Sequence, residues 1–161
     1  MNYNKIVDVH KRQSKNLIRS SNLSAVVRLP VTQTSSGNPL FGDFSRETST
    51  AGVEKGPFQC LWYDALTAKS MGKQDSKGVE KIVENSPGQF REATAFAEFW
   101  LEDVLIDPSD AGGQTWFDKS QNVVVGQQRF KFLGYAKLGL SVEAPYLLMV
   151  GLKGSLGYDE P

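Results

Sequence analysis

The chain of 161 residues contains one cysteine and one histidine, and this scarcity excludes several kinds of chemistry. Without a second cysteine, Cys60 cannot form an internal disulfide, and zinc or iron–sulfur binding would need ligands from elsewhere. With His10 as the one imidazole, a mechanism that uses several imidazoles is excluded. No apolar run approaches the roughly 18 to 20 residues that span a bilayer. We therefore expect no catalytic residue, no metal, no cofactor and no membrane partner.

Net charge is also absent, because 18 basic residues balance 18 acidic ones, but the charges are unevenly distributed. Residues 1–28 carry six bases against one acid, whereas residues 92–118 carry seven acids and no base. Such a division can bring identical molecules together head to tail, or direct the basic segment to a polyanion. The alternative is a solvated helix face at one end and acidic loops at the other.

Residues 3–20 are predicted to form a helix, because apolar residues recur at spacings of three and four. The stripe comprises Ile6, Val9 or His10, Gln13, Leu17 and Ile18. This stripe is thin, so the helix needs a partner surface to be stable. We expect the rest of the helix to expose a basic face that includes Lys11, Arg12 and Lys15.

The remainder of the chain is dominated by short strand-like runs separated by turns. The predicted strands are 25–31 (with Pro30 limiting it to an edge or an end), 58–66, 79–83, 90–106, two runs around Gly126, and 146–152, which the polar tail ends. Helical spacing also fits 90–106, but a strand is preferred because its neighbours are strands. The absence of β–α–β alternation predicts a mainly β fold, a small barrel or sandwich with an N-terminal helix.

Residues 32–57 are rich in Ser, Thr and Gly, and we interpret them as a long extended loop or arm. Phe41 and Phe44 make its centre too apolar for a plain linker, so we expect them to pack on a neighbouring subunit. The predicted organisation is a single domain made of a basic helix (1–22), a strand plus arm (23–57), a barrel core (58–156) and a tail (157–161).

Three groups of side chains could in principle support catalysis or metal binding. Glu98, Glu102, Asp103, Asp107 and Asp110 could form a paired-carboxylate or hard-metal site, but a solvated strand edge and turn is the preferred interpretation. We expect Cys60 to be buried and inert, and His10 to lie at the surface of a basic helix.

Aromatic residues are plentiful in the predicted strands. They could stack nucleic-acid bases on an open barrel face while Arg129 and Lys131 contact phosphate, as in an OB-like nucleic-acid-binding barrel. The alternative is that they fill the barrel.

The combination of a basic N-terminal helix, a long loop, a small barrel and an aliphatic last strand resembles the neck proteins of tailed bacteriophages. This is the head–tail connector family of head-closure, adaptor and stopper proteins. The resemblance is greatest over 93–152, where ATAFAEFWLEDV precedes VVVGQQRFKFLGYAKLG and the closing strand APYLLMVGLK. The long 32–57 segment and the extended helix depart from the shorter members of that family.

The resemblance implies a structural protein of the virion, present in the host cytoplasm during assembly. Copies would form a homo-oligomeric ring between a portal or adaptor above and a tail terminator below, and genomic DNA would pass through the channel without sequence-specific binding. Because ring contacts are heterologous, the two charge blocks would be complementary across them. The residues expected at such an assembly interface are Lys11, Arg12, Lys15, Phe41, Phe44, Glu98, Glu102 and Asp103.

Overall fold

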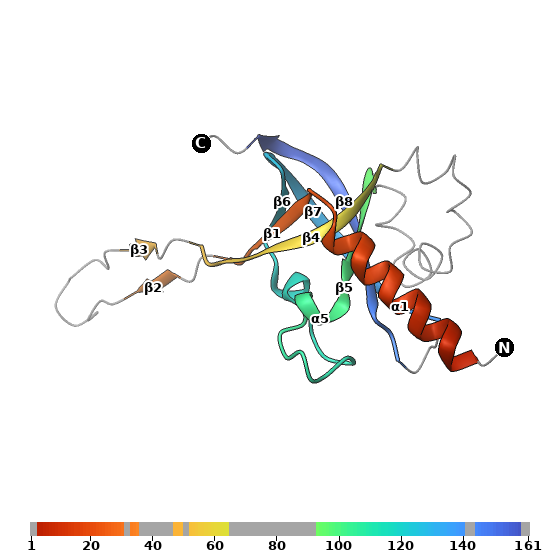
Figure 1. Cartoon of the computed structure of the whole chain (residues 1–161). Helices are drawn as coiled ribbons and strands as arrows, with labels where there is room; N and C mark the ends of the chain where they lie inside the picture. The colour runs from red at the N-terminus through yellow and green to blue at the C-terminus, as the bar shows by residue number, and fades with distance from the viewer. Residues whose placement is uncertain are drawn as a thin grey trace.

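The fold of the computed structural model is a closed barrel of antiparallel strands in the order β1-β4-β5-β8-β7-β6, which confirms the predicted mainly β class (Figure 1). The structure describes residues 3–30, 33–35, 47–49, 52–64, 93–140 and 144–158. The barrel strands are β1 (Ser24–Arg28), β4 (Glu54–Asp64), β5 (Ala95–Trp100), β6 (Asn122–Val125), β7 (Gln128–Leu138) and β8 (Leu147–Tyr158). Because β1 pairs with both β4 and β6, it belongs to the barrel, which therefore begins well before residue 58.

The strand predicted at 58–66 begins earlier, at Glu54, and includes a cis Gly56–Pro57 bond. Gly56 has φ +117°, and a Cβ there would lie 2.9 Å from the Ala25 carbonyl oxygen. The register between β1 and β4 shifts between Ala25 and Val27, opposite this dipeptide. A β-bulge accommodates the proline, which is why the turn-like composition of 54–57 conceals a strand.

The predicted hairpin around Gly126 is confirmed, since β6 and β7 pair directly across a turn at which Gly126 has φ +62°. The last strand is longer than predicted: β8 does not end in the polar tail but continues to Tyr158, which pairs with Gln128 of β7. Pairing with a long neighbour extends a strand beyond its apolar run, because backbone hydrogen bonds do not depend on side-chain polarity.

Residues 90–106 were predicted as one strand, and the structure corrects this to a strand followed by a helical turn. β5 lies between β4 and β8 and then continues into α5 (Leu101–Val104). Leu101 and Val104 are buried at helical spacing, which explains why both periodicities were visible. The run that begins at Trp116 is likewise not a strand at first, because Trp116–Lys119 form a 3₁₀ helix.

The segment interpreted as a long loop contains a two-stranded ribbon. β2 (Gln33–Ser35) pairs antiparallel with β3 (Glu47–Ser49), and Figure 1 shows both strands well away from the barrel. The strand predicted at 79–83 lies outside the described residues.

Two buried clusters hold the barrel together and fix the N-terminal helix to it. The barrel interior is filled by the side chains of every barrel strand, among them Val27, Cys60, Phe99, Val123, Phe130 and Val150. A second cluster lies under α1 (Tyr3–Arg19) and comprises Ile18, Trp100, Tyr146 and Leu147. The helix packs against β4 and β5, on the outside of the barrel.

Candidate assembly surface

The helix α1 uses a different face for packing than its apolar spacing predicts. Ile18 is fully buried, whereas Ile6, Val9 and Leu17 are 42%, 54% and 57% exposed. The predicted stripe is therefore wrong for all but Ile18 and the half-buried His10. The packed face instead contains the half-buried side chains of Val7, His10, Lys11, Ser14 and Lys15.

Two lysines on this packed face lie over aromatic rings of the barrel. Lys11 Nζ is 5.4 Å from the centre of the Tyr146 ring, and Lys15 Nζ is 5.0 Å from that of Trp100. A long lysine stem covers apolar surface while its ammonium group stays near water, and the ring face attracts the cation. Contrary to expectation, these two residues belong to the contact between helix and barrel, and only Arg12 of the three is exposed.

Polar contacts fix the helix to the connection between β7 and β8. His10 Nδ1 lies 2.5 Å from the Tyr146 hydroxyl, which also accepts the Leu140 N–H at 3.3 Å. The Tyr3 hydroxyl donates to the Leu140 carbonyl at 2.7 Å. Burial raises the pKa of Tyr146, and the hydrogen bond from the Leu140 N–H partly opposes this rise.

The acidic segment after β5 is held in a defined shape by its own carboxylates. Asp107 accepts the N–H and the hydroxyl of Ser109 at 3.0 and 2.6 Å, and these bonds lower its pKa. Asp110 accepts the Gly112 N–H at 3.0 Å. Lys137 of β7 donates to the carbonyls of residues 111 and 113 at 3.0 and 2.6 Å, which anchors the loop to the barrel.

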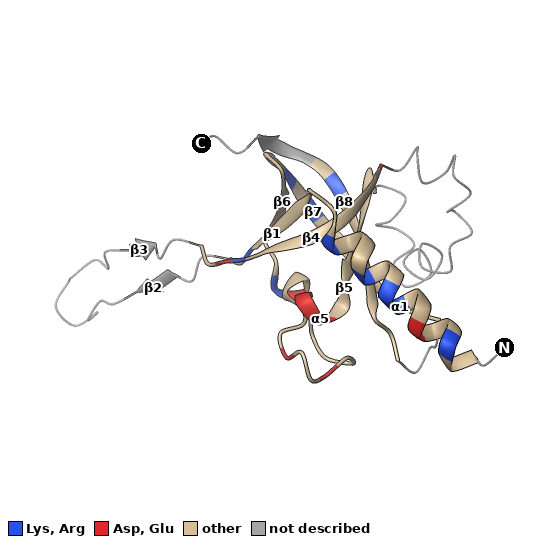
Figure 2. Cartoon of the chain, in the orientation of Figure 1, with Lys and Arg blue, Asp and Glu red and all other residues tan. Residues whose placement is uncertain are grey.

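Basic and acidic blocks lie near each other within one chain, as Figure 2 shows for α1 and for α5 with its following loop. Arg19 of α1 forms an ion pair with Asp103 at 3.9 Å. Glu102 is exposed and accepts the Trp100 indole N–H at 3.2 Å, whereas Glu98 is half-buried in β5. Part of the charge complementarity expected between subunits is thus satisfied inside the subunit.

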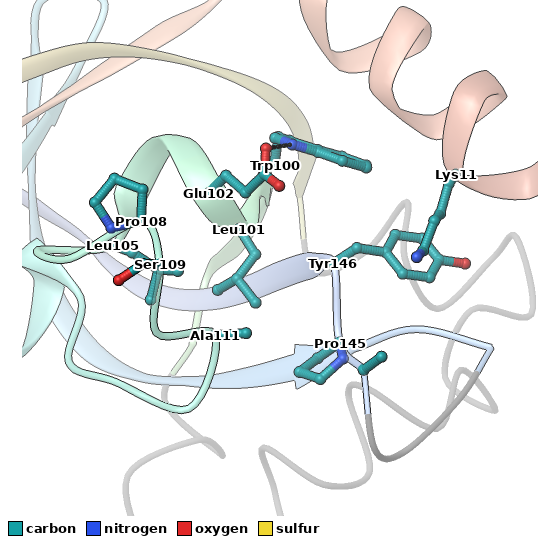
Figure 3. A pocket seen from close by; sticks show the side chains of 11 residues that line it. Lys11, Trp100, Leu101, Glu102, Leu105, Pro108, Ser109, Ala111, Pro145 and Tyr146 are labelled. Carbon is teal, nitrogen blue, oxygen red and sulfur yellow. Dashed lines mark hydrogen bonds between the residues drawn. The ribbon is translucent and has the colours of Figure 1, made fainter. Parts of the chain in front are cut away.

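A pocket of about 410 Å³ opens between α1, α5 and the start of β8 (Figure 3). Lys11 and Glu102 supply its charged groups, and most of the other lining residues are apolar or aromatic: Trp100, Leu101, Leu105, Pro108, Pro145 and Tyr146. The loop that carries Ser109 and Ala111 forms one side of it. The pocket can receive apolar side chains that come with basic neighbours.

The expectations about chemistry have different outcomes. Cys60 is buried in the barrel, and burial raises the pKa of its thiol to about 12, so it is not an activated nucleophile. Among the described residues, no group of three or more His, Cys, Asp or Glu could hold a metal ion. Phe130, expected either to stack bases or to fill the barrel, is buried and packs 5.0 Å from Trp62.

The expected interface residues are therefore only partly brought together. Arg12, Glu102 and Asp103 are exposed, and Glu102 also lines the pocket, whereas Phe41 and Phe44 lie outside the described residues. The pocket itself was missed by sequence reasoning. Its wall combines α5 with Pro145 and Tyr146, which are distant in sequence, so no local motif could reveal it.

Comparison with known proteins finds no matching family model, curated protein or solved structure. Among the helices of the described segments, none has the length and apolar character needed to cross a membrane.

Proposed function

We propose that this protein is a structural component of the neck of a tailed bacteriophage. In this role, copies form a ring between portal and tail, close the DNA-filled head and provide the surface on which the tail docks. The barrel serves as the scaffold, and the helix, the acidic loop and the β2–β3 ribbon serve as contacts to other subunits. No reaction is part of this function.

The observation that carries the proposal is the arrangement of unlike surfaces around one closed barrel. The exposed apolar and basic face of α1 is distinct from its packed face, whose Lys11 lines the pocket, and the acidic residues lie on α5 and the loop after it. Two unlike surfaces on one subunit are what a heterologous contact requires. The ribbon of β2 and β3 extends away from the barrel, where it can reach over a neighbour (Figure 1). These features suit a subunit that repeats around an axis.

The proposal is tested by adding the purified protein to DNA-filled heads that carry a portal. We expect a ring of density at the portal vertex by electron microscopy, and DNA retained in heads that otherwise lose it. Heads that show no added density and lose their DNA at the same rate would contradict the proposal.

A second candidate function, nucleic-acid binding by the barrel wall, is favoured by one observation. Lys131 of β7 is paired in register with Lys153 of β8, on the side of the sheet opposite the buried Phe130 and Leu152. Two basic side chains at one register position place positive charge on this side of the sheet, and positive charge attracts the phosphate backbone of a nucleic acid. Binding of short duplex DNA that weakens steeply with salt, and is lost in Lys131→Gln, would favour this candidate over the neck.

A further inference from the structure

We infer that the outer face of α1 of one copy docks on the pocket beside α5 of a second copy, and that this contact repeats head to tail. The inference deepens the proposed function and rests on it, because repetition of one heterologous contact is what closes a ring. It assigns the contact to Ile6, Val9 and Arg12 on one side and to the pocket and its acidic rim on the other.

The first step is that exposed apolar surface is concentrated on α1. Of the six large apolar side chains that are exposed in the described part of the chain, four belong to this helix: Tyr3, Ile6, Val9 and Leu17. Ile6 and Val9 are one turn apart, and Leu17 continues the same stripe two turns further. Because the helix packs another face on the barrel, this exposed stripe adds no buried apolar area within the subunit. It is therefore available to contact a second copy.

The second step is that the acceptor has matching chemistry. One wall of the pocket is formed by Trp100, Leu105 and Pro108. The pocket volume of about 410 Å³ is large enough to hold aliphatic side chains. Its rim carries Glu102 of α5, and exposed Asp107 lies on the loop that follows α5. Lys11 of the receiving copy also lines the pocket, but its ammonium group lies over the Tyr146 ring. Glu102 and Asp107 therefore supply the acidic side of the rim for an incoming apolar stripe flanked by cations.

The third step excludes the simplest alternative, in which two α1 helices pair with each other. The helix carries five cationic side chains and one carboxylate, Asp8, so two such helices would repel. Lys5, Arg12 and Arg19 are all exposed. The described acidic surface on α5 and the loop after it has the opposite sign, and Arg19 already contacts Asp103 of α5 within one chain. Charge thus selects a heterologous contact over a symmetric one.

The experiment uses sedimentation velocity on the full chain over a range of concentration and salt. The wild-type protein should self-associate at low ionic strength and dissociate as salt rises. Val9→Ser removes an apolar contact, Arg12→Glu reverses a charge on the helix, and Ala111→Lys adds a cation to the pocket side. Each should weaken self-association about tenfold or more. Val53→Ser is the matched control, since Val53 is 51% exposed but lies in the approach to β4.

Mixing two variants distinguishes the proposed contact from any symmetric one. Arg12→Glu keeps an intact pocket and Ala111→Lys keeps an intact helix, so an equal mixture should form one-to-one dimers and no larger species. Variants must melt as the wild type does, and Leu17→Ser replaces any helix variant that does not.

Several results would overturn the inference: a wild type that stays monomeric at every concentration and salt, equal weakening by Val53→Ser, or a mixture that forms no dimer. Binding of phosphatidylserine vesicles through the Val9 stripe, without self-association, would assign that stripe to a lipid surface instead. Self-association of a protein that never binds phage heads would contradict the proposed function alone. Normal rings on heads from the helix variants would contradict the inference alone.

Discussion

At the scale of single residues, the packing of α1 depends on lysine stems as much as on apolar side chains. Lys11 and Lys15 cover Tyr146 and Trp100, and the one fully buried aliphatic residue of the helix is Ile18. A hydropathy scale treats both lysines as polar, so the apolar spacing predicts a packed face different from the observed one. When the lysine stems are counted as apolar surface, the face that contacts the barrel is continuous.

Adjacent residues of α1 provide a direct check of this orientation. Ile18→Ala should lower the free energy of unfolding by about 2–4 kcal/mol, because it leaves a cavity beneath the helix. Leu17→Ala, at the next position but exposed, should change it by less than about 0.5 kcal/mol. Urea denaturation followed by tryptophan fluorescence measures both. Equal losses for the two variants would contradict the observed face.

The hydroxyl of Tyr146 gives a second prediction. Tyr146→Phe removes the hydrogen bond to His10 and the acceptor of the Leu140 N–H, and should cost about 1–2 kcal/mol of unfolding free energy. Tyr3→Phe loses one exposed hydrogen bond and should cost less than half as much. The same denaturation experiment compares the two variants. A larger loss for Tyr3→Phe than for Tyr146→Phe would contradict the role of the Tyr146 hydroxyl in holding the helix.

Two groups with raised pKa values, the buried thiol of Cys60 and the half-buried hydroxyl of Tyr135, predict how stability depends on alkaline pH. Burial raises the pKa of Cys60 from 9.0 to about 12, and burial with Asp118 nearby raises that of Tyr135 from 10.0 to about 12. Both neutral forms are favoured in the folded state, so their contribution to stability is complete below the unfolded pKa values and is lost as pH rises from about 9 to about 12.

Denaturation midpoints measured between pH 8 and pH 11 should therefore fall, and Cys60→Ala should fall less steeply than the wild type. A wild-type midpoint that stays constant over this range would contradict the raised pKa values of both groups.

At the scale of elements, the barrel closes through β1 and β6 without any contribution from α1. Deleting residues 1–20 should thus leave a barrel that melts cooperatively, at a lower temperature, because Trp100 and Tyr146 lose their cover. The deletion should also abolish self-association. Differential scanning calorimetry and sedimentation measure the two effects, and a truncated chain with no cooperative transition would make the helix part of the core.

Some elements could be predicted from the sequence for clear physical reasons. The hairpin at Gly126 was predictable because a positive-φ glycine between two runs of β-branched and aromatic residues is a local signal. The start of β4 was not, because a bulge at Gly56–Pro57 depends on β1, which is far away in sequence. Residues 95–104 carry both periodicities because strand and helical turn follow without a break.

At the scale of the whole molecule, the two charge blocks were visible in the sequence but their relation was not. The sequence predicts complementarity between subunits, whereas Arg19 and Asp103 pair within one. The pocket was unpredictable, since it depends on how α1, α5 and the residues just before β8 converge. Charge alone could identify Arg12 and Glu102 as candidate interface residues. That Ile6 and Val9 face outward could be known only from how the helix packs on the barrel.

The placement of β8 between β5 and β7 has a mechanical consequence. A strand paired along both sides must break many backbone bonds together under a force along its axis, whereas α1 is held by side chains and can detach by peeling. Under tension the helix should therefore yield first and the barrel later, at a higher force. A subunit built this way can give up or exchange its helix contact while its scaffold still bears load.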